Sequence, residues 1–286
     1  MSSAPAINAF FDEATNSVSY LVADPASGAA AVIDPVLDFD AGSGIVATHS
    51  TDRVLSVAAE QDLRIEWVLE THVHADHLSA AGLIRERTGA RVGIGTGVAE
   101  VQRVFGPILG ASDLDAGDFD RLLADGDEID LGERTIEVLA TPGHTPACVS
   151  YRVGDAVFVG DTLFMPDYGT ARCDFPGGCP DKLYQSIQRI LSLPRETRLF
   201  LCHDYKAPGR DSYAWETTVG DEADRNVHVG GGKSEREFTA MRRARDATLC
   251  APKLLYPAIQ VNIRGGRLPP AEADGSVFLK IPVTLP

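Results

Sequence analysis

One short segment of the sequence places four side chains that commonly bind metal ions within six residues. The segment is THVHADH at residues 71–77, and it directly follows an apolar run that is typical of a buried strand. Side chains alternate along an extended chain, so His72 and His74 can point the same way, with Asp76 and His77 on the turn that follows. Any fold of this chain therefore has to accommodate three imidazoles and a carboxylate at the end of one strand.

Three later segments carry similar side chains, and each of them also follows an apolar, strand-like run. Their candidate ligands are His144 in TPGHT, Asp161 in GDT and His203 in CHD. Strand ends in folds of mixed strands and helices bring loops to one rim, where such folds place their sites. The sequence therefore predicts that these three side chains meet the histidines of residues 71–77.

The number of histidines decides between a structural and a metal-binding interpretation. Taken singly, a histidine at a strand end is usually a satisfied core or surface residue. Asp76 alone could cap a helix, and Asp161 alone could belong to a turn. Five of the seven histidines fall in the four segments, however, and packing them beside two carboxylates stabilises nothing without a cation. We therefore predict a metal site.

The rest of the chain alternates short strands with helices. Hairpins are predicted at residues 17–35, 125–144 and 148–161, and a further strand at 198–204. Helices are predicted at residues 51–61, 78–88 and 181–193 from their apolar faces, and another one starts where Ser234 and Glu237 form a capping box. Strands that arrive as hairpins favour sheets covered by helices over a doubly wound sheet. From residue 252 onward the sequence is rich in proline.

Charge and cysteine content limit the kinds of partner and the cell compartment that the sequence favours. The 286 residues include 41 acidic and 26 basic side chains, and a net charge of −15 repels phosphate backbones and anionic lipids. We therefore expect neither a nucleic acid nor a membrane as partner, and no run approaches the ~18 apolar residues that would span a bilayer. The five cysteines form no C-x-x-C pair, which fits a protein of the reducing cytoplasm. A homo-oligomer is compatible with the sequence.

The ligand pattern resembles that of the metallo-β-lactamase superfamily. The matching residues are His72, His74, Asp76 and His77, followed by His144, Asp161 and His203. This resemblance covers about residues 8–205 and implies an α+β fold, an αββα sandwich with the metal site at the edge between two sheets. We expect a catalytic domain at residues 1–205. A C-terminal extension at residues 206–286 is expected to pack on the same domain and to contribute to the substrate site.

Within the superfamily, three segments resemble the persulfide dioxygenases, namely residues 19–40, 160–178 and 257–269. That resemblance implies a single Fe(II) per chain, with two imidazoles and one carboxylate as ligands and open positions for dioxygen and a substrate sulfur. The residues that match these ligands are His72, His144 and Asp161. The residues that match the second zinc site of hydrolase relatives, and that are expected here to orient the iron ligands by hydrogen bonds, are His74, Asp76, His77 and His203.

The reaction implied by the resemblance converts glutathione persulfide, dioxygen and water to glutathione and sulfite. Because the substrate carries carboxylates, a protein with a net charge of −15 has to offer local positive charge. Arg172 and Arg225 are the candidates, since both align with glutathione-contacting regions of the family, and Tyr205 offers a hydroxyl donor. Either arginine could instead form an ordinary surface ion pair.

Two other functions are compatible with the same ligands. The first is a glyoxalase II-like hydrolase of glutathione thioesters, with two zinc ions bridged by Asp161 and a metal-activated water as nucleophile. Every ligand type that it needs is present, although no long helical C-terminal domain is evident. The second is a non-catalytic sensor of sulfide or iron that acts through a partner. Metal content and oxygen consumption distinguish the three functions.

Overall fold

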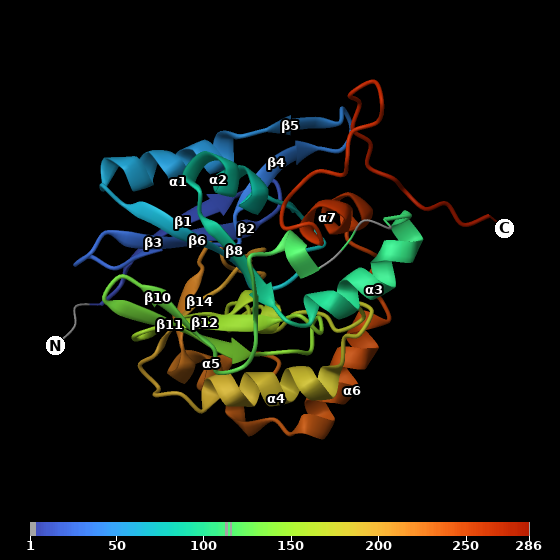
Figure 1. Cartoon of the computed structure of the whole chain (residues 1–286). Coiled ribbons are helices and arrows are strands. Elements are labelled where there is room, and N and C mark those ends of the chain that lie inside the picture. Colours follow the sequence, from blue (N-terminus) through green and yellow to red (C-terminus); the bar gives the residue numbers. More distant parts are fainter. Residues whose placement is uncertain (1–3, 112–113, 115, 286) are drawn as a thin grey trace.

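Two six-stranded sheets pack face to face in the computed structural model, and helices cover the outer face of each sheet (Figure 1). The structure describes residues 4–111, 114 and 116–285. The first sheet consists, in spatial order, of β1 (Ala6–Asp12), β2 (Ser17–Ala23), β3 (Ala29–Ile33), β6 (Arg64–Glu70), β8 (Arg91–Gly95) and β9 (Arg121–Leu123). Its first three strands are antiparallel, and the remaining neighbours are parallel.

The second sheet is mostly antiparallel, with one parallel pair between β13 and β14. Its strands, in spatial order, are β10 (Glu128–Leu131), β11 (Arg134–Ala140), β12 (Val149–Val153), β13 (Ala156–Phe158), β14 (Arg198–Phe200) and β15 (Glu216–Thr218). A small third sheet has the order β5 (Ile45–Ala47), β4 (Val36–Asp40) and β7 (Leu78–Ser79). The αββα sandwich predicted above is confirmed.

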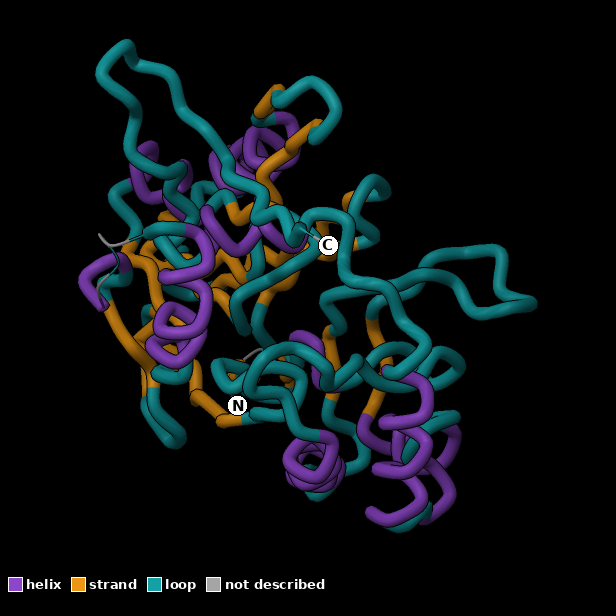
Figure 2. The backbone as a smooth tube through the Cα atoms, turned by 90° about the vertical axis from the view of Figure 1, so that its right-hand side faces the viewer, coloured by secondary structure: helices purple, strands orange, loops and turns teal. Residues whose placement is uncertain are grey.

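The helices form the two outer layers. The helices whose apolar side chains join the core under the first sheet are α1 (His49–Glu60), α2 (Ala81–Thr88), α3 (Val98–Leu109) and α7 (Leu255–Asn262). Those that pack on the second sheet are α4 (Pro180–Leu191), α5 (Val219–Arg225) and α6 (Glu235–Asp246). In the side view of Figure 2, most strands lie inside and most helices lie around them.

The alternation of side chains in β2 shows how the sequence builds these layers. Val18, Tyr20 and Val22 belong to the core between the two sheets. Leu21 and Ala23 point the other way and belong to the core between the first sheet and its helices. Successive side chains of a strand lie on opposite faces, so a strand that is buried on both faces is apolar along most of its length. This pattern places β2 in the interior of the sandwich.

The predicted hairpins and the capping box are present, but some helix limits differ from those predicted. α1 begins at His49 rather than at residue 51, and α2 begins at Ala81 because residues 78–79 pair with β4. The capping box joins Ser234 and Glu237 at the start of α6, as predicted. The sequence patterns did not indicate α3, α5 or α7.

The chain beyond residue 205 contributes to both outer layers. It adds β15, α5 and α6 to the second sheet and its helices, and it then crosses to place α7 on the first. Among the described residues, no helix is long and apolar enough to cross a membrane. A contribution of residues 206–286 to substrate binding stays a prediction.

Candidate metal centre

The four predicted segments all follow strands, and both sheets contribute to them. Residues 71–77 follow β6 of the first sheet. His144, Asp161 and His203 follow β11, β13 and β14 of the second sheet. The strand ends of two different sheets therefore deliver the histidines and carboxylates to one place, as expected for a site built on loops over a rigid scaffold.

Three of these side chains form what we call the first donor group, namely His72, His144 and Asp161. All three are buried, and their potential ligand atoms lie within 4.8 Å of one another. The Asp161 Oδ2 atom lies 3.4 Å from His144 Nε2 and 3.9 Å from His72 Nε2. Two imidazoles and one carboxylate thus converge on one point, an arrangement that suits a divalent transition metal.

The far nitrogen of each imidazole in the first donor group is fixed by a protein contact. His144 Nδ1 donates to the backbone carbonyl of Arg172 at 2.7 Å, and His72 Nδ1 lies 3.0 Å from the Thr71 hydroxyl. Metal-binding histidines generally use such contacts to set the tautomer and the ring orientation. These contacts leave both Nε2 atoms facing the Asp161 carboxylate.

The first donor group contains a buried nitrogen that the protein does not satisfy and that a metal ion would. Among the residues that the structure describes, none is a hydrogen-bond partner of the buried His72 Nε2, which is costly for a polar atom unless a ligand satisfies it. Burial and the adjacent His74 lower the pKa of His72, so its imidazole is kept in the neutral form that binds metals. The donor set therefore suits the iron that the family resemblance implies.

A second donor group consists of His74, Asp76 and His203, whose potential ligand atoms also lie within 4.8 Å of one another. Asp76 Oδ2 lies 3.4 Å from His203 Nε2 and 3.3 Å from His77 Nδ1. The Ser17 hydroxyl reaches the same Asp76 oxygen at 3.2 Å. Although burial raises it, the imidazoles of His203 and His77 hold the pKa of Asp76 well below its usual range. These residues thus already interact with one another.

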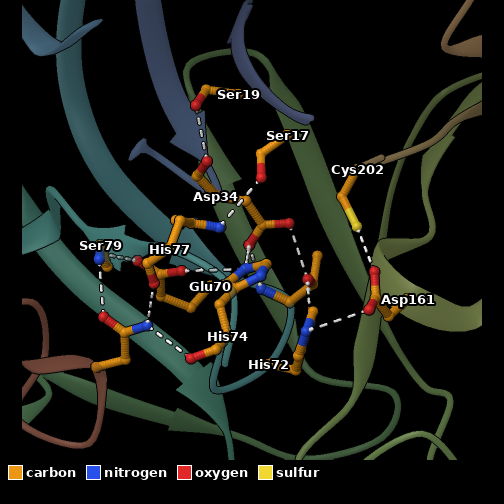
Figure 3. Close-up of polar contacts among 12 residues, drawn as sticks. Ser17, Ser19, Asp34, Glu70, His72, His74, His77, Ser79, Asp161 and Cys202 are labelled. Carbon is orange, nitrogen blue, oxygen red and sulfur yellow. Dashed lines mark hydrogen bonds and ion pairs between the residues drawn. The ribbon is translucent and has the colours of Figure 1, made fainter. Parts of the chain in front are cut away.

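His74 in the second donor group is engaged by two carboxylates that sequence reasoning missed. Its Nε2 atom lies 3.0 Å from Asp34 Oδ1 and 3.6 Å from Glu70 Oε2. Figure 3 shows the three side chains together. Burial alone would lower the pKa of His74, but Asp34 and Glu70 raise it to about 10. Asp34 is held in turn by the backbone N–H and the hydroxyl of Thr71, at 2.7 and 2.8 Å. The clue in the sequence was that Asp34 also follows an apolar strand.

Asp161 joins the two donor groups, and each of its oxygens faces a different one. Oδ2 faces the first donor group, while Oδ1 accepts a hydrogen bond from the Cys202 thiol at 2.8 Å and lies 3.4 Å from His203 Nε2. Burial and the adjacent Asp161 raise the pKa of the Cys202 thiol well above its usual value, so the thiol is protonated and can donate. Figure 3 shows its contact with Asp161. Sequence reasoning did not assign this role to Cys202.

The predicted substrate-contacting residues lie in three different settings. Tyr205 stacks on His203 with 5.5 Å between ring centroids, next to the second donor group. The Arg172 guanidinium binds both oxygens of Asp174, at 2.5 and 2.6 Å, although the backbone of Arg172 touches His144. Arg225 lies on α5, where its side chain is 65% exposed and pairs with Asp221 at 2.5 Å. Their roles in substrate binding stay predictions.

The fold and the paired donor groups define an enzyme of the αββα metalloenzyme class, and comparison with known proteins gives the family. The metallo-beta-lactamase superfamily model matches residues 12–203, and the chain belongs to this superfamily. A crystal structure of ETHE1 from Myxococcus xanthus superposes with a TM-score of 0.74 at 35% identity, covering 92% of this chain and 100% of that one. This agreement confirms the metallo-β-lactamase fold.

Similar proteins of known sequence carry different functional names. A probable metallo-hydrolase of Burkholderia pseudomallei is 51% identical over 97% of this chain and 98% of that protein. Glyoxylase B2 of Dictyostelium discoideum is 42% identical, covering 92% of this chain and 91% of that protein. The mitochondrial persulfide dioxygenase ETHE1 of Homo sapiens is 32% identical, covering 68% of this chain and 66% of that protein. Further relatives at 50% identity are longer, and this chain spans 65% of their length.

Proposed function

We propose that this protein is a persulfide dioxygenase with one Fe(II) per chain. Glutathione persulfide, dioxygen and water would be converted to glutathione and sulfite, which detoxifies sulfide. The observation that carries the proposal is the first donor group, because two imidazoles and one carboxylate are typical of non-haem iron oxygenases. The similarity to ETHE1 proteins, one of them named a persulfide dioxygenase, supports the same activity.

The residues around the first donor group would prepare the site for a single metal ion. The Arg172 carbonyl orients His144, and the Cys202 thiol engages the Asp161 oxygen that faces away from the first donor group. When bound, Fe(II) would offer open positions for dioxygen and the substrate sulfur and would supply electrons to dioxygen, which Zn²⁺ cannot do because it has no accessible redox state. We propose His72, His144 and Asp161 as the ligands.

Aromatic rings would cover the reacting sulfur and limit the access of water. Tyr205, Tyr168 and Phe164 form a cluster with ring centroids 5.2–5.9 Å apart, and Phe164 lies 6.0 Å from the ring of His203. The Tyr205 hydroxyl would donate to the substrate, and Arg172 and Arg225 would attract the glutathione carboxylates. The five cysteines are all free, which supports a reducing compartment such as the cytoplasm.

The second candidate function is hydrolysis of glutathione thioesters at a two-zinc site. The observation that favours it is that the Nε2 atoms of His77 and His203 are buried and, within the described part of the chain, lack hydrogen-bond partners, as His72 Nε2 does. The names of the Burkholderia and Dictyostelium relatives point the same way. In this alternative, Asp161 would be a ligand shared by the two metal ions, which would supply an activated water as nucleophile.

Metal analysis and oxygen uptake on protein purified without air distinguish the two functions. We expect one iron per chain, and oxygen uptake with glutathione persulfide that matches the sulfite formed. The His144→Ala variant serves as the inactive control in the same assay. Two zinc ions per chain together with hydrolysis of a glutathione thioester, and no oxygen uptake by iron-loaded protein, would overturn the proposal.

A further inference from the structure

Helix α7 touches the loop that carries the clustered histidines, although it lies outside the residues matched by the superfamily model. Asn262, the last residue of α7, is only 4% exposed. Its Nδ2 donates to the backbone carbonyls of His74 and His77, both at 2.8 Å. Its Oδ1 accepts from the backbone N–H of Ser79 at 2.7 Å. Figure 3 shows Ser79, His77 and His74 on the side of the site away from Asp161 and Cys202.

These three bonds use the full donor capacity of one amide. A primary amide offers two N–H donors and a carbonyl acceptor, and here both donors and the acceptor bind backbone groups of the same loop. This loop directly follows His72 and includes Asp76 and His77. A single buried side chain therefore sets the path of the backbone that presents these side chains.

Helix α6 makes a comparable contact with the other half of the site. Asp246 Oδ2 accepts from the backbone N–H of Cys173 at 2.9 Å, and Asp246 Oδ1 pairs with Arg242 at 2.6 Å. Arg242 is 1% exposed and donates to the carbonyl of Thr170 at 3.1 Å. These contacts bracket Arg172, whose carbonyl accepts from His144 Nδ1.

We infer that the C-terminal segment completes the metal centre, with Asn262 and Asp246 as positioning residues for its two halves. Asn262 holds the loop that follows His72, and Asp246 holds the loop whose Arg172 carbonyl orients His144. Hydrogen bonds of this kind, made to the backbone beside the ligands, determine how well the ligands are preorganised for a metal ion. The inference rests on the metal site of the proposed function, but it does not depend on whether that site oxidises persulfides or hydrolyses thioesters.

Gln260 provides a matched control for Asn262. It lies on α7 two residues earlier, is 2% exposed and also carries an amide. Its side chain donates to the carbonyls of Tyr256 and Lys280 and accepts from the N–H of Lys280, so it holds the C-terminal tail. A change at Gln260 therefore disturbs a buried amide of the same helix without touching the histidine loop.

The test compares Asn262→Asp with Gln260→Glu in metal-free protein titrated with Co²⁺, whose visible absorption reports both affinity and ligand geometry. In Asn262→Asp, a carboxylate oxygen faces the carbonyls of His74 and His77. We expect cobalt affinity to fall about 10- to 100-fold and the absorption spectrum to change. Gln260→Glu should leave the cobalt affinity and the absorption spectrum unchanged, even if it lowers the melting temperature as much as Asn262→Asp does. Equal cobalt affinity in the two variants would overturn the role of Asn262.

Two further variants keep the inference testable if Asn262→Asp does not fold. Asn262→Ser keeps one hydroxyl donor, so we expect a smaller loss of cobalt affinity, and wild-type affinity would refute the inference. Asp246→Asn is compared with Arg243→Gln, which removes an exposed ion pair to Asp181 from the same helix. Only Asp246→Asn should weaken cobalt binding.

The titration uses neither oxygen nor persulfide, so it separates this inference from the proposed function. Wild-type protein that binds cobalt but consumes no oxygen with persulfide would contradict the dioxygenase proposal alone. Wild-type protein that binds no cobalt would overturn both the metal site and the role of Asn262.

Discussion

The two donor groups that meet at Asp161 differ in how far the protein itself satisfies them. In the first, the outer nitrogens of His72 and His144 are anchored and their Nε2 atoms face one carboxylate oxygen. In the second, His74 Nε2 lies 3.0 Å from Asp34 Oδ1 and the pKa of His74 is raised to about 10, whereas His203 Nε2 has no hydrogen-bond partner among the described residues. A metal ion that binds His74 in the second donor group has to displace Asp34 and a proton from that imidazole, whereas the imidazoles of the first donor group are already oriented toward Asp161. We therefore expect a first metal ion to bind at His72, His144 and Asp161.

The largest effect is expected from removing a member of the first donor group. His72→Ala, His144→Ala and Asp161→Ala should each abolish bound iron and activity together, because a three-ligand site has no spare ligand. Iron content by elemental analysis and oxygen uptake measure the two losses. His49→Ala, at an exposed histidine at the start of α1, is the control and should change neither. Near-normal iron in any of the three variants would disprove the ligand role of that residue.

A smaller effect is expected from the second donor group. His203→Ala should keep much of its iron and lose part of its activity, since residues that orient metal ligands typically contribute ~10- to 100-fold in affinity or rate. The two-zinc alternative predicts a different result, in which one of two bound metal ions is lost. Counting metal ions in this single variant therefore sharpens the comparison between the two donor groups.

Removing the Cys202 thiol should reduce the difference in metal binding between the two donor groups. Its thiol occupies Asp161 Oδ1, the oxygen that a second metal would need. A hydrogen bond to a charged group contributes about 1.5 kcal/mol, so Cys202→Ala should tighten binding of a second Zn²⁺ about tenfold. Cys202→Ser keeps a donor and should behave like the wild type in the same titration. Weaker binding of a second metal in Cys202→Ala would instead make the sulfur a ligand, together with Asp161 and His203.

The residues of the first donor group could be brought together from the sequence because of where they occur along the chain. His72, His144 and Asp161 each follow an apolar strand, and strand ends of packed sheets are close in space. Partners from other parts of the fold left no such signal. Asn262 lies 185 residues after His77, within residues 257–269, which resemble the dioxygenases without indicating a contact with the histidines. Cys202 resembles an ordinary buried cysteine until Asp161 is placed beside it.

The sandwich itself was predictable from hairpins and from the family resemblance, whereas the helices α3, α5 and α7 were not. α7 has only eight residues and contains Pro257, which reads as a helix breaker. Proline is tolerated there because the first turn of a helix has no intrahelical partner for its N–H groups. Such a short helix owes its stability to packing, and Ala258, Ile259 and Val261 are fully buried. Tertiary contacts therefore decided the structure of this segment.

The smallest effect is expected from the arginines that would bind the carboxylates of the substrate. Arg225→Gln should raise KM for glutathione persulfide about fivefold, because an exposed ion pair contributes up to about 1 kcal/mol. Its kcat should not change, since a contact remote from the reacting sulfur is equal in ground and transition states.

Arg172→Gln is the informative partner of that variant. Its guanidinium ties Asp174 and the carbonyl of Cys250 together, while its carbonyl orients His144. Loosening this loop should lower kcat as well as raise KM. A small persulfide without carboxylates separates the two effects, because it should be insensitive to Arg225→Gln but still react slowly with Arg172→Gln. Equal losses with both substrates in Arg225→Gln would mean that Arg225 acts on the fold or the metal centre instead of on the carboxylates.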